Sequence, residues 1–381
     1  MTVWDRLVGQ AGVIETLQRA VGSDPGSGMS HAWLFTGPPG SGRSNAAVAF
    51  AAALHCESGG CGECKSCHEV AAGTHPDVQV TRTERLSIGV EEVRDLVRGS
   101  ALTPIGGRWQ ILVVEDADRL TESAANALLK AIEEPNARTV WLLCAPTVED
   151  VLPTIRSRTR LVVLSTPSTT EVAAFLVDRD GVDADVATYA ARASQGHIGR
   201  ARALARDPDT RRRRDRVVAI PAGLRDLGAC VRAAAELHEL AKEEAEAMTS
   251  VIDVEERSAL DEAYGVVERG RRPREYAPAL RDLEKSQKTR AKRRVLDVVD
   301  RGLMDLVSVY RDALALQIGS RSELVNADRR EDLSVLAQRS SPEEHLRRID
   351  AVFEAREQML EFNVPPLLAL ESMMVALRLA A

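Results

Sequence analysis

A glycine-rich turn between an apolar run and an alanine-rich stretch constrains the fold of this chain more than any other feature. The run at residues 32–35 predicts a buried strand, and residues 44–54 predict a helix. Between them, residues 37–44 follow the spacing G-x-x-x-x-G-K-[ST] except at Arg43, where the pattern has lysine. The glycines of this segment are Gly37, Gly40 and Gly42. They would let backbone N–H groups approach a phosphate at the start of the helix, so the segment predicts a phosphate loop.

Arg43 and Ser44 decide what such a loop could do. In the full pattern the lysine reaches the outer phosphates of a nucleotide, and the hydroxyl at the Ser44 position holds Mg²⁺. Arginine is larger, planar and forked, so Arg43 is not a conservative replacement. We therefore leave open whether the loop still binds ATP or ADP, and we expect no efficient hydrolysis. The alternative is a glycine-rich turn that binds nothing.

The first 165 residues alternate short apolar runs with helical stretches. Runs at residues 111–114, 140–144 and 161–164 predict three more strands. Residues 121–134 predict a helix that ends before Pro135, because proline cannot continue the helical hydrogen-bond ladder. Continuous apolar strands separated by helices indicate a parallel sheet with helices on both faces.

Two carboxylates, Glu115 and Asp116, directly follow the predicted strand at residues 111–114. Nucleotide hydrolases of this kind place an Asp for Mg²⁺ and then a Glu that polarises water at such a strand end. Here the order is exchanged, and displacing a reacting group by about 1 Å costs roughly two orders of magnitude in rate. The pair therefore predicts a degenerate nucleotide site. The alternative is two solvated carboxylates at a strand end.

The organisation along the chain predicts three domains. Residues 1–166 contain the predicted strands, and residues 166–168 indicate a linker. Residues 167–207 predict a small helical domain. A basic run at residues 211–214 follows, and residues 208–381 have helical periodicity with few strand signals. We therefore expect an α/β domain, a small helical domain and an all-helical domain.

Four of the six cysteines lie close together, at Cys56, Cys61, Cys64 and Cys67. Thiolates at this spacing can satisfy tetrahedral Zn²⁺ at ~2.3 Å each, and four sulfurs leave no open coordination position. Residues 55–68 therefore predict a lobe with a structural zinc ion. An Fe–S cluster is the competing metal, and free surface thiols are the other alternative. We expect the flanking His55, His68 and His75 to lie beside the ligands or on the surface.

Composition excludes several classes of protein. The formal net charge of −7 argues against a uniformly basic nucleic-acid coat, though not against a local basic patch. Aromatic residues make up 3% of the chain, too few for a module that reads single strands by stacking bases. No apolar run reaches the ~18 residues of a membrane span, and no secretory pattern opens the chain. We expect a cytoplasmic protein without a membrane partner.

Charge is segregated within the predicted helical domain. Residues 231–264 contain ten acidic and three basic residues, whereas residues 265–294 contain four acidic and eleven basic residues. The balances, −7 and +7, are equal and opposite. Two interpretations follow. The basic residues at 269–294 could track DNA phosphates, or the two stretches could form an antiparallel helical hairpin whose charges neutralise each other.

Two further motifs carry a resemblance to a known family. Residues 126–135 read NALLKAIEEP, and residues 155–159 read IRSRT. Together with residues 8–10, the phosphate loop and the cysteines after its helix, they make residues 1–205 similar to the AAA+ subunits of the bacterial DNA polymerase III clamp loader. Among these the chain most resembles the delta-prime subunits. The C-terminal third is similar mainly in being helical.

The resemblance implies a RecA-like AAA+ domain with an inserted zinc lobe, a small helical lid and a helical collar. Such a subunit joins gamma/tau ATPase subunits and a delta subunit in a hetero-pentamer. That assembly opens the sliding clamp and closes it on primer-template DNA. A delta-prime subunit acts as a stator, and its Ser-Arg motif supplies an arginine finger in trans, here Arg158, whose forked donors match phosphate oxygens. The alternative for Arg158 is a surface ion pair.

Departures from the ATPase pattern agree with this interpretation. The polar sensor position lies around Ala145 and Pro146, and the lid arginine expected at Gly199 is displaced to Arg200. The chain would then be part of the polymerase III holoenzyme without ATPase activity of its own, and whether it is an enzyme stays open. The other functions weighed are a working gamma/tau-like ATPase and a free DNA-binding zinc protein.

Overall fold

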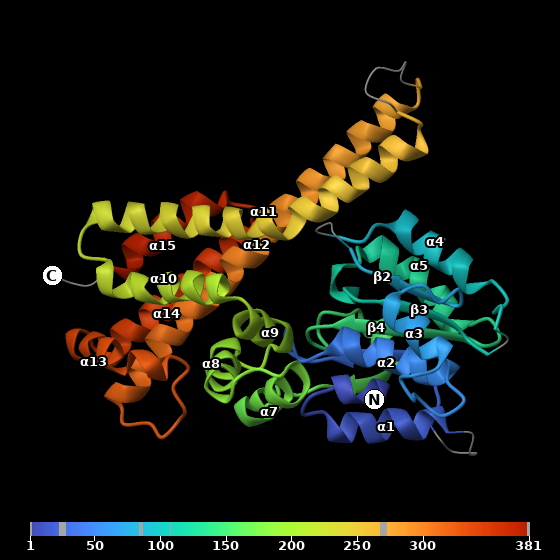
Figure 1. Cartoon of the computed structure of the whole chain (residues 1–381), viewed down its shortest axis with the longest axis horizontal. Helices are drawn as coiled ribbons and strands as arrows, with labels where there is room; N and C mark the ends of the chain where they lie inside the picture. Colours follow the sequence, from blue (N-terminus) through green and yellow to red (C-terminus); the bar gives the residue numbers. More distant parts are fainter. Residues whose placement is uncertain (1, 23–27, 84–86, 107, 267–272, 379–381) are drawn as a thin grey trace. The chain divides into compact units, whose positions relative to one another are not determined.

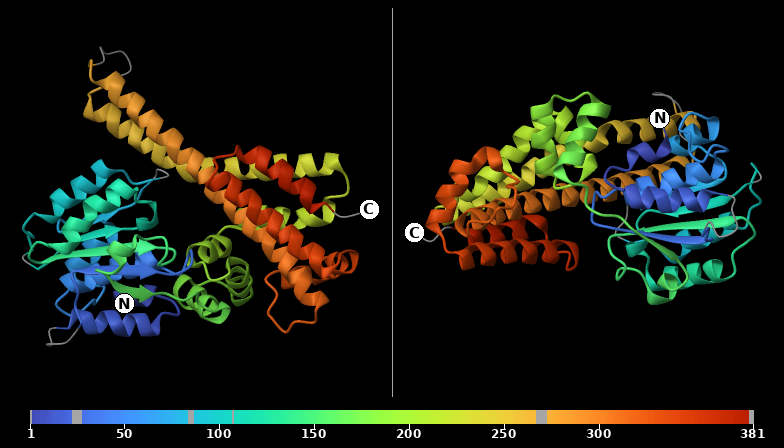
Figure 2. Two further views of the ribbon diagram at one scale, coloured as in Figure 1. Left: turned by 180° about the vertical axis from the view of Figure 1, so that it is seen from behind. Right: turned by 90° about the horizontal axis from the view of Figure 1, so that it is seen from below.

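The computed structural model describes residues 2–22, 28–83, 87–106, 108–266 and 273–378. These residues form two compact units that divide between Arg206 and Asp207. The first unit holds a β-sheet, and the second is helical (Figure 1; Figure 2). Among the described helices, none is both long enough and apolar enough to cross a membrane.

Five parallel strands form the sheet of the first unit. In chain order they are β1 (Ala32–Thr36), β2 (Val78–Thr81), β3 (Gln110–Val114), β4 (Thr139–Ala145) and β5 (Arg160–Val163). Across the sheet their order is β2-β3-β4-β1-β5, and every neighbouring pair is parallel. The strands β1, β3 and β4 are buried along their whole length because they lie in the centre and are covered on both faces.

Alternate side chains of the central strands enter two separate cores. In β1, Trp33 and Phe35 face one core and Leu34 faces the other. The helices over the first face are α1 (Ala11–Val21), α2 (Arg43–His55) and α3 (Lys65–Ala72). Those over the second face are α4 (Val90–Ser100), α5 (Glu122–Glu133) and the short α6 (Pro153–Arg156). Short 3₁₀ turns occur at Val3–Arg6 and Ala117–Arg119.

The predicted parallel sheet with helices on both faces is confirmed. The four predicted strands correspond to β1, β3, β4 and β5, and the two predicted helices correspond to α2 and α5. The strand β2 was not predicted. It lies at the edge of the sheet and is partly exposed, so its sequence alternates instead of forming a continuous apolar run.

Three short helices complete the first unit. They are α7 (Thr169–Asp180), α8 (Ala184–Ser194) and α9 (Ile198–Arg206), and they pack around a small core of their own. A capping box starts α7: Ser168 Oγ accepts the N–H of Glu171, and the Glu171 carboxylate accepts the N–H of Ser168. The linker predicted at residues 166–168 therefore ends where α7 begins. Because these helices group with the sheet in one unit, the three-domain division stays a prediction.

The described part of the second unit consists of α-helices and one 3₁₀ turn at Ala327–Arg329, which confirms the predicted helical C-terminal region. The α-helices are α10 (Pro208–Gly223), α11 (Leu227–Ala263), α12 (Tyr276–Gln317), α13 (Arg330–Arg339), α14 (Pro342–Leu360) and α15 (Pro366–Leu377). Their apolar faces share one core.

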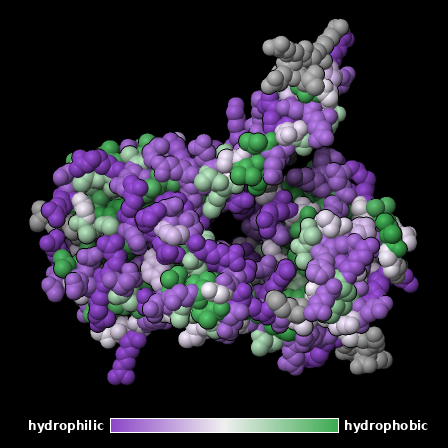
Figure 3. All heavy atoms as spheres, viewed as in Figure 1, coloured by the Kyte–Doolittle hydropathy of each residue, from purple (hydrophilic) through white to green (hydrophobic). Residues whose placement is uncertain are grey.

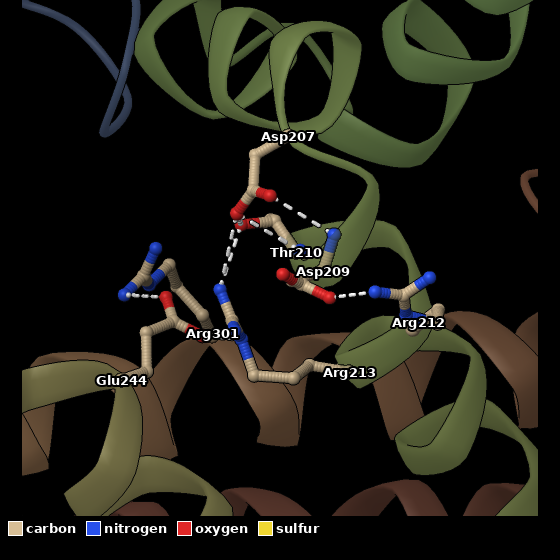
Figure 4. Close-up of polar contacts among 7 residues, drawn as sticks. All are labelled: Asp207, Asp209, Thr210, Arg212, Arg213, Glu244 and Arg301. Carbon is tan, nitrogen blue, oxygen red and sulfur yellow. Dashed lines mark hydrogen bonds and ion pairs between the residues drawn. The ribbon is translucent and has the colours of Figure 1, made fainter. Parts of the chain in front are cut away.

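A polar network fixes the first turns of α10 (Figure 4). The guanidinium of Arg213 contacts both Asp207, at 3.3 Å, and Glu244 of α11, at 3.1 Å. Glu244 also pairs with Arg301 of α12 at 2.9 Å. The basic run at residues 211–214 therefore contributes contacts within the helical unit.

Arg214, the next residue, is fully inside this unit. Its Nε donates to a carboxylate oxygen of Asp305 at 3.1 Å, and its Nη2 donates to Asn326 Oδ1 at 2.5 Å. All three residues are buried, and they come from α10, α12 and the segment after α12. The contacts of Arg214 therefore join elements that are distant in the sequence.

Helices α11 and α12 extend beyond the other helices of their unit as an antiparallel pair (Figure 1). We call residues 246–263 of α11 and 276–294 of α12 the arm. Arg290 of α12 pairs with Asp253 and Glu256 of α11, and Arg257 of α11 pairs with Glu284 of α12. The charge-neutralising hairpin is therefore present. The predicted basic residues at 269–272 lie outside the described residues.

Candidate functional site

The predicted phosphate loop connects β1 to α2. Gly40 has a φ of 83° and Gly42, which precedes α2, has a φ of 94°, both in the left-handed region that favours glycine. A Cβ at Gly40 would lie 2.3 Å from Cγ of His197, so His197, just before α9, packs directly on the loop. Any larger residue at position 40 would therefore strain the backbone and displace His197.

Arg43 folds back onto the loop to which it belongs. Its Nη1 donates a hydrogen bond to the carbonyl of Gly37. Burial lowers the pKa of Arg43, and the nearby Asp116 and Asp118 are among the groups that oppose this shift. In the usual pattern the lysine at this position extends to the outer phosphates. The cationic side chain of this loop is instead engaged by its own backbone.

Three hydroxyl side chains lie in or beside the loop. Ser44 lies in the first turn of α2 and is partly exposed. Thr36 Oγ1 and Ser41 Oγ are buried and have no hydrogen-bond partner within the described part of the chain. The loop thus retains its backbone shape and two buried hydroxyls, while Arg43 points elsewhere.

The two predicted carboxylates follow β3 but have different partners. Glu115 forms an ion pair with Arg82 at 2.5 Å, and this contact raises the pKa of Arg82. Asp116 Oδ1 lies 3.7 Å from Nε of Arg119. Asp118 is partly buried, and burial raises its pKa. The structure therefore places Asp116 and Asp118 near Arg43, whereas Glu115 is paired with Arg82.

The predicted sensor position after β4 carries no polar side chain. Ala145 is buried, and the carbonyl of Pro146 accepts the N–H of Gly37 at 3.1 Å. Thr147 comes one residue later, and both its N–H and its hydroxyl donate to Asp150 at 2.8 Å. Thr147 therefore stabilises its own turn.

Arg158 lies between α6 and β5. Its Nη2 is 2.7 Å from Oε1 of Glu133, the last residue of α5, and its Nη1 donates to the carbonyl of Thr154 at 2.9 Å. The side chains of Arg158 and Glu133 are 40% and 45% exposed. This ion pair joins the two motifs at residues 126–135 and 155–159. An exposed pair of this kind contributes only ~0–1 kcal/mol to stability, so Arg158 can exchange Glu133 for another anion.

The four predicted cysteines converge, and their sulfurs could hold one metal ion. The Sγ of Cys56 lies 3.6 Å from that of Cys61 and 3.8 Å from that of Cys64. Four sulfurs at ~2.3 Å from a central zinc ion would be about 3.8 Å apart, so the spacing fits tetrahedral zinc. The backbone N–H groups of Cys61, Gly62 and Cys64 donate to the sulfurs.

These donors favour the thiolate form that a metal needs. Burial raises the pKa of Cys56, but hydrogen bonds from the backbone of Cys61, Gly60 and Ser58 outweigh it and bring that pKa to about 6. A thiolate, not a thiol, is the metal ligand. At Cys67, by contrast, burial outweighs the hydrogen bond from the backbone of Gly62 and raises the pKa to about 12. The hydrogen bonds therefore favour a thiolate at Cys56 but not at Cys67.

Two family profiles match this chain. One, described as DNA polymerase III, delta subunit, matches residues 9–168, and another, described as DNA polymerase III, delta subunit, C terminal, matches residues 300–378. Curated proteins named DNA polymerase III subunit delta' are 35–45% identical to it over their aligned parts. Over these segments the chain is similar to DNA polymerase III delta-prime subunits. The first matched segment contains the phosphate loop, the cysteine lobe and Arg158, and the second lies in the helical unit.

Relatives of two kinds align with this chain. The delta-prime subunit of Pseudomonas aeruginosa is 45% identical over 136 residues, 34% of this chain and 41% of that subunit. The delta-prime subunit of Escherichia coli is 35% identical over 180 residues, 46% of this chain and 54% of that subunit. The gamma/tau subunit of Mycobacterium bovis is 33% identical over 191 residues, 48% of this chain and 32% of that subunit. The chain thus spans about half, or less, of the length of the relatives it matches.

A second cluster beside the cysteines was not predicted. His55, His75 and Asp77 are all buried, whereas His68 is exposed. Asp77 accepts the backbone N–H groups of Ile105 and Gly106 at 2.7 Å each, and His75 Nδ1 accepts the N–H of Asp77. The bonds from Asp77 tie the cluster to the loop before β3. The three residues could also hold a metal ion, and the buried Nε2 of His55 has no hydrogen-bond partner within the described part of the chain. Only the tertiary fold brings these residues together, so no local signal in the sequence predicted the cluster.

Proposed function

We propose that this chain is the delta-prime subunit of a replicative clamp loader and acts there without hydrolysing ATP. Its partners are gamma/tau ATPase subunits and a delta subunit in a hetero-pentamer that opens the sliding clamp and loads it on primer-template DNA. The chain serves as a stator and donates Arg158 in trans to the ATP site of a neighbouring subunit. The similarity to delta-prime subunits supports this role.

The observation that carries the proposal is the state of Arg158. Its guanidinium is exposed and is held in one direction by Glu133 and the Thr154 carbonyl. A γ-phosphate presented by a neighbouring subunit can replace Glu133 as the anionic partner. In the transition state of phosphoryl transfer, an arginine supplied in trans stabilises charge on the transferred group. Arginine suits this role because its forked donors match phosphate oxygens.

Three departures at the chain's own nucleotide loop support the absence of hydrolysis. Arg43 donates to Gly37 within the loop, Glu115 is engaged by Arg82, and Ala145 offers no polar side chain. The proposed nucleotide site, which is degenerate, comprises Gly37, Gly40, Gly42, Arg43, Ser44, Glu115 and Asp116. An ATP or ADP held there would contribute to structure, not to turnover.

We assign Zn²⁺ to Cys56, Cys61, Cys64 and Cys67. When bound, the ion supplies a closed four-sulfur site that fixes the lobe after α2 and leaves no position for substrate. Because Cys56 and Cys67 are buried against the core that α2 shares with the sheet, the lobe stiffens the end of the helix that begins at the phosphate loop.

The alternative is a working ATPase of the gamma/tau kind, which the alignment with a gamma/tau subunit favours. Steady-state ATPase assays decide between them. The reconstituted loader, with clamp and primed DNA, is compared with loader containing Arg158→Ala in this chain. Arg156→Ala is the matched control, because Arg156 is exposed and lies in the same motif.

We expect Arg158→Ala to lower kcat about tenfold or more, with Arg156→Ala near wild type, and no turnover by the isolated chain. Equal activity of the Arg158→Ala and wild-type loaders would overturn the trans role of Arg158. Turnover by the isolated chain that Arg43→Ala abolishes would instead establish an ATPase.

A further inference from the structure

The arm carries a row of cations on the side of α12 that faces away from α11. Arg281, Lys285, Lys288 and Lys292 are exposed. Their spacing of four, three and four residues places all four within a sector of about 60° on the helix surface, over about 16 Å of its length. Arg290, which pairs with the acids of α11, lies about 180° from Arg281. The row is therefore on the outer surface of the hairpin.

The acids of the arm do not neutralise this row. Asp253 and Glu256 pair with Arg290, and Glu284 pairs with Arg257. No ion pair joins Arg281, Lys285, Lys288 or Lys292 to any other residue that the structure describes. Arg281 Nε donates to the carbonyl of Ala277 in its own helix, which leaves its charge uncompensated. The hairpin thus cancels charge between its helices and leaves a separate positive face outside.

We propose that this face binds the phosphate backbone of double-stranded DNA without reading its sequence. Duplex DNA carries one negative charge per ~1.7 Å of axis, so a row of four cations over about 16 Å meets several phosphates. Three of the four residues are lysines, which bind phosphate as point charges and lack the fork that recognises guanine bidentately. No aromatic side chain belongs to the row, so stacking on single-stranded bases is not its role.

The arm is a rigid support for such a contact. The row is on a continuous helix, and cross-helix bonds hold that helix in place, including one from Gln287 Nε2 to the carbonyl of Asp253 at 3.0 Å. Figure 3 shows hydrophilic side chains over much of the described part of the arm. An exposed apolar group on the α11 side, Met248, Val251 and Val254, lies on the other helix and takes no part in this proposal.

The inference concerns the isolated chain and does not depend on Arg158 or on ATP hydrolysis. The test measures binding of the full chain to a fluorescently labelled duplex of about 25 base pairs by anisotropy, between 50 and 200 mM NaCl, as in salt titrations of other DNA-binding proteins. The variant carries Arg281→Gln, Lys285→Gln, Lys288→Gln and Lys292→Gln. The matched control carries four glutamines at dispersed, exposed arginines of the same unit: Arg225, Arg232, Arg321 and Arg330. Both variants lose the same charge.

We expect the arm variant to bind the duplex at least about tenfold more weakly at 50 mM salt. The magnitude of the slope of log affinity against log salt should fall by up to ~3.6, which is about 0.9 for each lost phosphate contact. The control should stay within twofold of wild type, and duplexes of different sequence should bind alike. Circular dichroism should show unchanged helix content in both variants.

Equal affinity of the arm variant and the control would overturn the proposal, as would the absence of wild-type binding at 50 mM salt. Poly-glutamate is the competitor that tests an acidic protein partner. If poly-glutamate displaces the duplex at equal charge concentration, the face recognises acidic polypeptide and the proposal fails. A variant that loses DNA binding but keeps normal loader ATPase activity bears on this inference alone. A variant that keeps DNA binding but loses loader ATPase activity bears only on the function proposed above.

Discussion

Two arginine–carboxylate pairs, one in each unit, have the same chemistry and opposite surroundings. Arg214 and Asp305 in the helical unit are 2% and 4% exposed, and Arg214 also donates to Asn326. Arg158 and Glu133 in the first unit are 40% and 45% exposed. Removing either charge of the buried pair leaves the other buried in the helical unit, away from water. The exposed pair can open at little cost.

The difference separates groups that hold the fold from groups that are available to another molecule. Arg43 and Glu115 belong to the first kind, since the Gly37 carbonyl and Arg82 satisfy them inside the chain. Arg158 and the outer face of the arm belong to the second kind. The charged side chains around the glycine-rich loop are therefore engaged within the chain, whereas the charged side chain of the Ser-Arg motif is exposed.

The largest effect is expected at the cysteine lobe, whose four sulfurs lie close enough together to hold one metal ion. Cys64→Ser should lower bound zinc from about one ion per chain to nearly none and destabilise the first unit by more than about 3 kcal/mol. Mass spectrometry of metals and thermal unfolding measure the two effects. Cys144→Ala is the control, because Cys144 is buried in β4 and should leave zinc bound. Full zinc in Cys64→Ser would contradict the assignment.

The next effect tests the buried side of the comparison. Arg214→Ala should destabilise the chain by about 3–5 kcal/mol, because the carboxylate of Asp305 would remain buried without the opposite charge of Arg214. Arg216→Ala, two residues along α10, should cost no more than about 1 kcal/mol, since Arg216 and Glu236 form an exposed pair. Urea unfolding monitored by circular dichroism gives both values. Similar costs for the two substitutions would erase the distinction between buried and exposed pairs.

Features that depend on residues close together in the sequence could be predicted. Contacts between residues that only the fold brings together could not. Continuous apolar runs predicted the central strands, and the spacing of Cys56, Cys61, Cys64 and Cys67 predicted their convergence, because each signal is local. The edge strand β2 has no such run, and the partners of Arg43 and Glu115 come from backbone geometry and from Arg82, thirty-three residues away from Glu115. The pairing of Arg158 with Glu133 joins two motifs that the sequence identified separately.

The smallest effect on stability and the finest test concern Glu133. Glu133→Gln keeps the size of the side chain and removes the charge that directs Arg158, so unfolding should change by less than about 1 kcal/mol. In the assembled loader kcat should fall by about threefold to tenfold, less than with Arg158→Ala, while KM for ATP stays unchanged. Such a split is expected of a positioning residue, because in the proposed function Glu133 orients Arg158 without touching ATP. Glu134→Gln is the control, since Glu134 is its exposed neighbour in the same motif. If Glu133→Gln and Glu134→Gln give the same kcat, Arg158 finds its direction without Glu133, and the exposed pair is only a surface contact.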